Sequence, residues 1–276
     1  MRTLLVGFDS AWTPNNSGSL IGVLRMDDGT FRELGPPLIV DYPQAEGIIL
    51  RWQTELVPTA TIVLLDQPTI VNNAAGQRPV ENIVASAVSL RYGGMQPANT
   101  SREDMFGTMA PMWKFLARFG GPADPLEPVA DTRVFETYPV LAMIALLWTL
   151  PDSRPAGRLP KYNPERKKTF SISDWQHVCG LASTAFHERG LMEIAQWLDV
   201  AARNASPRKS DQDGLDARLC LLVALYLAER KDCLMVGDRK TGYIVVPYGG
   251  GILSELQTRC DRTGRSPSEW VRVFRL

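Results

Sequence analysis

Short apolar segments alternate with helical patterns along this chain, and this alternation restricts its possible folds more than any other feature. Residues 3–12 (TLLVGFDSAW) and 19–26 (SLIGVLRM) are apolar runs joined by the turn-forming segment TPNNSG, which predicts a β-hairpin. A helical pattern over 42–56 ends before Pro58, and 60–66 has the continuous apolar character of a buried strand. This order predicts an α/β fold.

The second half of the chain continues the pattern. Residues 133–139 read as another buried strand, 141–148 as a short buried helix, and 233–247 as two strands around a turn. We therefore predict a mixed sheet, with an antiparallel first hairpin and parallel strands after it, flanked by helices. The chain is predicted to form a single domain, 1–276, and its helical insertions are expected at about 69–130 and 150–211.

Composition excludes several classes of protein. Apolar residues make up 45% and charged residues 22% of the chain, as in an ordinary globular protein. Thirty basic and thirty acidic residues cancel, so only local patches can indicate a polyanionic partner. The four scattered cysteines form no C-x-x-C pair, which argues against a zinc ribbon or a disulfide framework and favours a cytoplasmic location. No apolar run has the length of a membrane span.

Acidic residues interrupt or end the predicted strands. Asp9 lies in the first strand, Asp66 ends the strand before Gln67, and Glu136 lies within VFETYPV. Each has a local explanation: a hydrogen bond, a turn, or an exposed edge strand. If the three strands are parallel neighbours, however, their carboxylates converge at the carboxyl ends of the sheet, where open α/β sheets bind ligands.

Two further aspartates open the long apolar helix in SDQDGLDARLCLLVALYLAER, residues 210–230. Ser210 followed by Asp213 fits a capping box, which would explain Asp213 as a helix cap. Asp216 lies one turn deeper, and a spacing of three residues places both carboxylates on one face of the helix. This helix can therefore add two carboxylates to those from the sheet.

Several carboxylates held together in a protein interior need a compensating cation. Oxygen ligands select hard cations, so Mg²⁺ is the expected cofactor and Mn²⁺ a substitute. Zinc would require histidine or cysteine ligands, and His177 and His187 form no H-E-x-x-H pattern. Both histidines are interpreted as structural or surface residues.

The chain resembles the ribonuclease-H-like superfamily, in particular a bacterial family of predicted ribonuclease-H-like nucleases. The resemblance rests on GFDSAW, LLDQP, QRPVENIVAS, FETYP and DQDGLDARLCLLVA, in this order. The D-x-x-D-A opening of the last motif also resembles the Holliday-junction resolvases. The stretch between Asp66 and Glu136 and the insertion after residue 150 have no counterpart in the minimal fold.

The resemblance implies phosphodiester hydrolysis by two metal ions, with nucleic acid as the substrate. Asp9 would bridge both metals, Asp66 and either Asp216 or Asp213 would complete the ligands, and Glu136 would be a further ligand or a positioning group. Two cations about 4 Å apart can activate the attacking water and stabilise the leaving oxygen, so no covalent nucleophile is required.

Basic residues cluster in PKYNPERKK, residues 160–168. Lys161, Lys167 and Lys168 could follow a phosphate backbone, with Tyr162 as a stacking platform. The alternative is a solvated polar insertion, because lysine and arginine are normally exposed. Of the tryptophans, Trp12 is the one that lies close to a predicted site residue.

Two other functions remain open. An actin-like ATPase or sugar kinase shares the strand-and-aspartate opening, but it needs glycine-rich phosphate loops, and DSAWTPNNSG is a poor match. A non-catalytic scaffold would keep the fold and use an insertion to bind nucleic acid or a protein partner. The set of five acids, Asp9, Asp66, Glu136, Asp213 and Asp216, argues against the scaffold.

Overall fold

The computed structural model describes residues 1–14, 16–88, 95–127, 130–153 and 157–276, and its first strands form one mixed sheet. These strands are β1 (Thr3–Asp9), β2 (Gly18–Arg25), β3 (Phe31–Glu33), β4 (Leu38–Val40), β5 (Ala60–Leu65) and β6 (Thr132–Glu136). Their order is β3-β2-β1-β5-β6, and β4 pairs with β2. β1 is antiparallel to β2 and parallel to β5, which is in turn parallel to β6. The predicted hairpin and parallel strands are confirmed, and the arrangement is consistent with a ribonuclease-H-like sheet.

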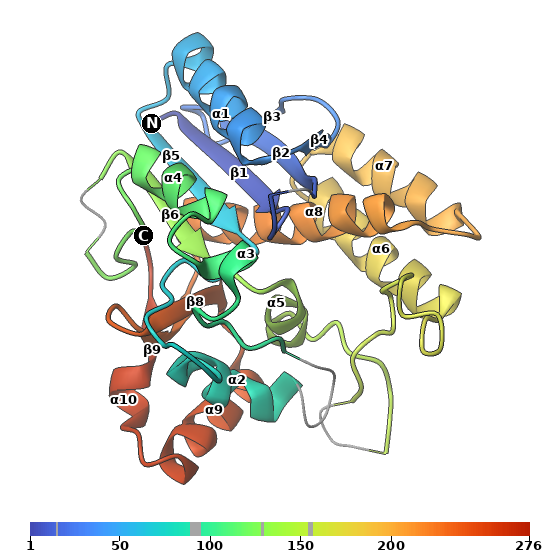
Figure 1. Ribbon diagram of the computed structural model, residues 1–276. Helices are drawn as coiled ribbons and strands as arrows, with labels where there is room; N and C mark the ends of the chain where they lie inside the picture. The colour runs from blue at the N-terminus through green and yellow to red at the C-terminus, as the bar shows by residue number, and fades with distance from the viewer. Residues whose placement is uncertain (15, 89–94, 128–129, 154–156) are drawn as a thin grey trace.

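Helices surround this sheet, and a second, smaller sheet follows it in the chain (Figure 1). The helices are α1 (Tyr42–Leu56), α2 (Pro79–Val88), α3 (Glu103–Phe106), α4 (Pro111–Arg118), α5 (Pro139–Ala145), α6 (Ile172–His187), α7 (Met192–Arg203), α8 (Lys209–Ala228), α9 (Gly250–Arg262) and α10 (Pro267–Trp270). The second sheet has the order β8-β7-β9, from β7 (Cys233–Asp238), β8 (Gly242–Pro247) and β9 (Val271–Phe274). β7 and β8 are the predicted strand pair, whereas β9 was not predicted.

Helix α1 shows how local sequence sets an element's ends. Asp41 caps it, because the N–H of Gln44 donates to Asp41 Oδ1 at 2.8 Å, and Pro43 in the first turn needs no hydrogen-bond acceptor. The helix ends at Val57, which has a left-handed φ of 44° immediately before Pro58. The predicted range of this helix, 42–56, is therefore confirmed.

The two faces of the main sheet are covered by different helices. On β1, Leu4 and Phe8 pack into a core with residues of α1 and α4, while Leu5 points to the opposite core, which contains α8. Successive side chains of a strand point to opposite faces, so a strand buried on both sides must be apolar at almost every position. This explains the continuous apolar runs in the sequence, and it makes Asp9 at the end of β1 an exception.

Helix α8 approaches β1 unusually closely at one residue of the strand. A Cβ atom placed on Gly7 would lie 2.1 Å from the carbonyl oxygen of Ala217 and 2.4 Å from the backbone nitrogen of Leu221. Only glycine allows this contact, because both obstacles are backbone atoms that cannot rotate away. The close contact fixes α8, and the aspartates in its first turns, relative to the end of β1.

Gly7→Ala is expected to lower the free energy of unfolding by about 1 to 3 kcal/mol, because the added methyl group forces α8 away from the sheet. Urea denaturation would measure the change. Gly47→Ala is the matched control, since Gly47 lies in α1 with no atom within 4 Å of the added Cβ. In that helix the same substitution is expected to stabilise the protein by about 0.5 to 1 kcal/mol. Equal effects at the two glycines would contradict the close-contact explanation.

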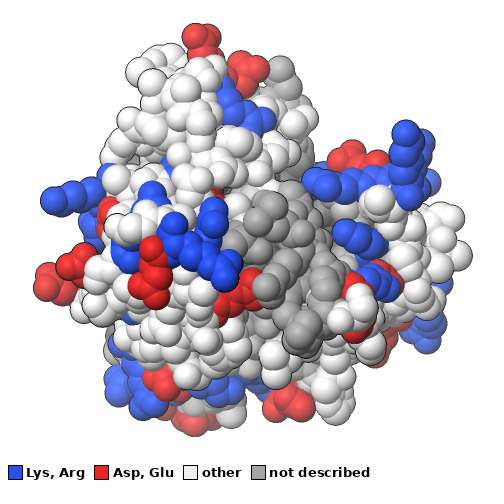
Figure 2. Space-filling model, turned by 90° about the horizontal axis from the view of Figure 1, so that it is seen from below, with Lys and Arg blue, Asp and Glu red and all other residues white. Residues whose placement is uncertain are grey.

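The surface carries charges of both signs. On the face drawn in Figure 2, basic and acidic side chains are interspersed, as the balanced composition leads one to expect. Within the described ranges, no helix combines the length and apolar character required to cross a bilayer. Recognition of a charged ligand therefore depends on local groups of side chains.

Candidate functional site

The carboxylate of Asp9 lies at the carboxyl end of the central strand. It shares the α8 face of β1 with Leu5 and Gly7, because alternate residues of a strand point the same way, and only 6% of its surface is exposed. Asp66 follows the neighbouring strand β5, and its N–H donates to the carbonyl oxygen of Phe8 at 2.9 Å. This hydrogen bond extends the parallel ladder and holds the two aspartates beside each other.

Helix α8 brings two more aspartates to this edge, although its start differs from the prediction. The helix begins at Lys209, and its first turn is closed by Asp211, whose Oδ2 accepts the N–H of Arg208 at 2.7 Å. The predicted capping box of Ser210 and Asp213 is therefore wrong, since Ser210 already lies inside the helix. Asp213 instead forms an ion pair with Lys209, one turn before it.

Asp216 is the deepest acid on α8, with 5% of its surface exposed. The hydroxyl of Tyr162 donates to its Oδ1, and the side-chain Nε2 of Gln212 donates to its Oδ2, both at 2.9 Å. Tyr162 was predicted to be a stacking platform; it lines the cleft, but it is only 7% exposed and packs in the core. The structure gives this tyrosine a different role, because its hydroxyl orients a carboxylate.

Burial and mutual repulsion disfavour the ionised forms of these acids. Burial, and then the charges of Asp216 and Asp66, raise the pKa of Asp9 well above its usual value. Burial and the charge of Asp216 do the same to the pKa of Asp66. Burial also raises the pKa of Asp216 to about 6, even though the ammonium group of Lys209 lowers it. The site therefore has more negative charge than its own cation can compensate.

The donor set fits a hard divalent cation. Asp9, Asp66 and Asp216 offer only carboxylate oxygens, the ligands that Mg²⁺ and Mn²⁺ prefer. Among the described residues, however, no group of three or more His, Cys, Asp or Glu side chains could hold a metal ion in its present arrangement. Like-charge repulsion separates carboxylates when no cation lies between them, so binding would require these side chains to move closer together.

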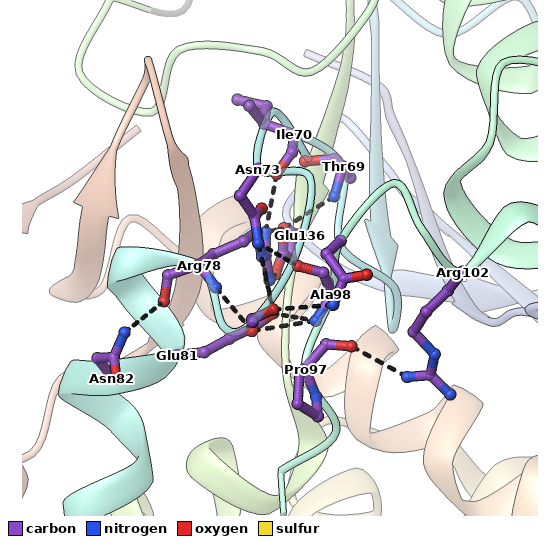
Figure 3. Close-up of polar contacts among 12 residues, drawn as sticks. Thr69, Ile70, Asn73, Arg78, Glu81, Asn82, Pro97, Ala98, Arg102 and Glu136 are labelled. Carbon is purple, nitrogen blue, oxygen red and sulfur yellow. Dashed lines mark hydrogen bonds and ion pairs between the residues drawn. The ribbon is translucent and has the colours of Figure 1, made fainter.

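Glu136 ends β6, but its oxygens are engaged elsewhere. Figure 3 shows it facing Arg78, whose two terminal nitrogens donate to Oε2 at 2.9 Å and to Oε1 at 2.6 Å. The N–H of Thr69 donates to Oε2 at 2.8 Å, and Arg78 Nε also donates to Glu81 at 2.8 Å. Of the two roles expected for Glu136, metal ligand or positioning group, this geometry favours the second.

The Arg78 cluster, defined as Arg78, Glu81 and Glu136, is wholly buried. The carboxylate of Glu81 also accepts the N–H of Ala98, at 3.2 Å to Oε1 and 3.1 Å to Oε2. The cluster thereby ties the start of α2 and the chain near residue 98 to the end of β6 (Figure 3). It fixes one wall of the space in front of the carboxylates.

These groups line a cleft of about 640 Å³. The predicted acids Asp9, Asp66, Glu136, Asp213 and Asp216 all contribute to it. Of the predicted basic residues, Lys161 lines the cleft, whereas Lys167 and Lys168 are exposed and are not among its described lining residues. Lys209 and Arg166 add positive charge to the lining. A volume of this size is typical of a site for a small ligand or a short segment of a polymer.

A family model described as "Protein of unknown function (DUF429)" matches residues 23–241, more than half of the chain. The chain belongs to the DUF429 family. No curated protein and no solved structure matched it significantly. The DUF429 match includes Asp66, Glu136, Asp213 and Asp216, but it begins within β2 and leaves out β1 with Asp9. In the structure β1 nevertheless pairs with both β2 and β5.

Sequence reasoning did not assign a role to several residues that shape this site of the DUF429 chain: Lys209, Arg78, Gln212 and Arg166. Lys209 lies four residues before Asp213, and that spacing on a helix could have indicated the ion pair. Arg78 lies three residues before Glu81 in the QRPVENIVAS motif, a spacing that could have indicated their pairing. Its contact with Glu136, 58 residues away, left no local signal.

Proposed function

We propose that the chain is a metal-dependent phosphodiesterase that hydrolyses nucleic acid. The supporting observation is that Asp9, Asp66 and Asp216 line one cleft, where burial raises the pKa of each and the charge of Asp216 raises the pKa of the other two further. Folding such carboxylates together costs free energy, and a cation is the simplest compensation. The resemblance to ribonuclease-H-like nucleases points to the same chemistry.

In this proposal Asp9, Asp66 and Asp216 would hold Mg²⁺ or Mn²⁺. A bound divalent cation would supply activation of the attacking water and stabilisation of charge on the leaving oxygen. Tyr162 and Gln212 fix the orientation of Asp216 through their two hydrogen bonds. These contacts give one of the three carboxylates a defined orientation, whereas the side chains of the set would still have to move closer together to bind the cation.

Other residues would bind and position the substrate. Lys209, at the start of α8, and Lys161 and Arg166, in the segment between α5 and α6, all line the cleft and can attract a phosphate. The Arg78 cluster holds a wall of the cleft in place. We place the activity in the cytoplasm, because the four cysteines are buried free thiols.

The test is a hydrolysis assay on metal-depleted protein, with Mg²⁺ or Mn²⁺ added back. The substrates would be bis(p-nitrophenyl) phosphate and labelled RNA, DNA, hybrid and four-way-junction oligonucleotides. Asp9→Asn is expected to lower the rate by about 100-fold or more, because even residues that only support metal ligands cost about 10- to 100-fold when replaced. Asp199→Asn, an exposed aspartate on α7, is the matched control and should keep the wild-type rate.

Two results would contradict the proposal. One is the absence of hydrolysis of every substrate with either metal, which would favour a scaffold. The other is hydrolysis that is insensitive to Asp9→Asn. ATP-dependent thermal stabilisation without phosphodiester cleavage would instead support an actin-like ATPase or kinase.

A further inference from the structure

Trp12 has a left-handed backbone conformation although no helix ends there. Four non-glycine residues in the described ranges have a positive φ: Trp12, Val57, Leu147 and Arg230. The last three lie just after α1, α5 and α8, where a left-handed residue is normal. Trp12, with φ 53°, follows a strand, and the N–H of Thr13 donates to the carbonyl of Ala11 at 2.6 Å across it.

This hydrogen bond spans three residues and makes a γ-turn centred on Trp12. A γ-turn whose central residue has a positive φ is strained, and such strain at a bulky residue persists only where the surroundings hold it. The indole Nε1–H donates to the carbonyl oxygen of Asp66 at 2.9 Å. The turn therefore directs a large aromatic ring to the residue that carries a candidate metal ligand.

The ring of Trp12 is partly exposed and lines the cleft together with Asp9 and Asp66. Phe106 of α3 supports it in an edge-to-face arrangement, with ring centroids 6.0 Å apart. A supported, partly exposed indole beside a phosphate-binding site can stack against a planar base.

Because the carboxylates are buried, only some ligands can contact both them and the ring of Trp12. Asp9 and Asp216 are at most 6% exposed, and the cleft in front of them holds about 640 Å³. In a duplex the bases are stacked and paired inside, so no base can lie on an aromatic side chain unless it is unpaired. Exposed Lys161 and Arg166 line the same cleft and can contact the phosphates that flank such a base.

We propose that the cleft takes an unpaired nucleotide of a nucleic-acid strand, with its base stacked on Trp12 and its phosphate facing Asp9, Asp66 and Asp216. The substrate is then a single strand, or a single-stranded end or loop, and Trp12 is the residue that selects it. This inference rests on the proposed function for the role of the carboxylates. The stacking itself does not require turnover.

Binding is measured with a fluorescein-labelled oligonucleotide about 12 nucleotides long, within the usual range of site sizes, alone or annealed to its complement. Full-length Asp9→Asn protein with Mg²⁺ serves as the background, so that cleavage does not obscure the anisotropy signal. We expect the single strand to bind at least about tenfold more tightly than the duplex. Adding Trp12→Leu should raise the Kd for the single strand by about tenfold to a hundredfold.

Two further variants show whether an effect of Trp12→Leu comes from lost stacking, from impaired folding or from the smaller side chain. Trp12→Phe keeps an aromatic face and should retain most of the affinity that Trp12→Leu loses. Trp113→Leu is the matched control, because Trp113 is also partly buried and donates its Nε1–H to a backbone carbonyl, that of Gly107, but does not line the cleft. It should leave the Kd unchanged, and thermal unfolding checks that each variant folds.

The inference is overturned if duplex and single strand bind equally, if neither binds, or if Trp12→Leu and Trp12→Phe have the same Kd. Cleavage by the protein with an intact Asp9, assayed in parallel, separates this failure from that of the proposed function. If cleavage depends on Asp9 but is unchanged by replacing Trp12, the proposed hydrolysis is supported and the stacking site is rejected. If single strands bind only when residue 12 is aromatic and no cleavage occurs, the stacking site is supported and the proposed hydrolysis is rejected.

Discussion

Arg78→Met is expected to lower the free energy of unfolding by about 3 to 5 kcal/mol, the usual cost of leaving a buried charge without its partner. Arg78 is the cation between Glu81 and Glu136, and all three side chains are buried. Although burial disfavours its charge, Glu136 and Glu81 hold the pKa of Arg78 above its usual value. Methionine fills a similar volume, so the loss measured by urea denaturation reports the charge and its hydrogen bonds.

Two comparisons sharpen this experiment. Arg102→Met removes a partly exposed arginine that donates to Pro97 and Gln96 in the same part of the chain, and its cost should stay within about 0.5 kcal/mol. Combining Arg78→Met with Glu136→Gln should recover part of the loss, because one unpaired charge disappears. A small effect of Arg78→Met, or no recovery in the double variant, would show that the cluster is not held together by charge.

Asp216→Asn is expected to stabilise the metal-free protein at neutral pH by up to about 3 kcal/mol. The pKa of Asp216 is raised to about 6 in the fold, roughly two units above its usual value, and one unit corresponds to about 1.36 kcal/mol. Between those two values the folded state binds more protons than the unfolded state, so the wild-type protein loses stability as the pH rises. Asparagine carries no charge and avoids this loss.

The pH dependence identifies the cause. The difference in unfolding free energy between variant and wild type should be near zero below about pH 4 and grow through pH 6. Gln212 Oε1 has no hydrogen-bond partner in the part of the chain that the structure describes, so turning its amide offers an acceptor to the new side chain. Added Mn²⁺ should raise the Tm of the wild type and not that of the variant. A difference that is constant with pH would contradict the electrostatic explanation.

The sequence predicted the main sheet and the place where acids meet, because both depend on short-range patterns. The apolar runs containing Leu5 and Leu64 fixed the strands, and Asp9 and Asp66 were noticeable because each interrupts such a run. Asp216 was found because it lies three residues after Asp213 on an apolar helix. Their convergence followed from the rule that parallel strands end at the same edge.

The rest of the site depends on contacts between distant segments. Tyr162 meets Asp216 across 54 residues, and its burial could not be read from the basic segment around it. The first turn of α8 is closed by Asp211 and not by the predicted pair Ser210 and Asp213, because the helix starts earlier than the apolar pattern does. Strand β9 is short and follows a helix directly, so its pairing with β7 left no periodic signal.

Because β1 lies in the middle of the main sheet, a fragment of this protein that lacks it would have an incomplete sheet. The segment that the DUF429 model matches, residues 23–241, omits β1 and most of β2 at one end and β8 and β9 at the other. A fragment with those limits would leave one side of β5 and both sides of β7 without hydrogen-bonding partners, and open strand edges promote aggregation. The two flanks of the matched segment, far apart in sequence, therefore each complete a different sheet: β1 supplies the partner of β5, and β8 and β9 supply the partners of β7.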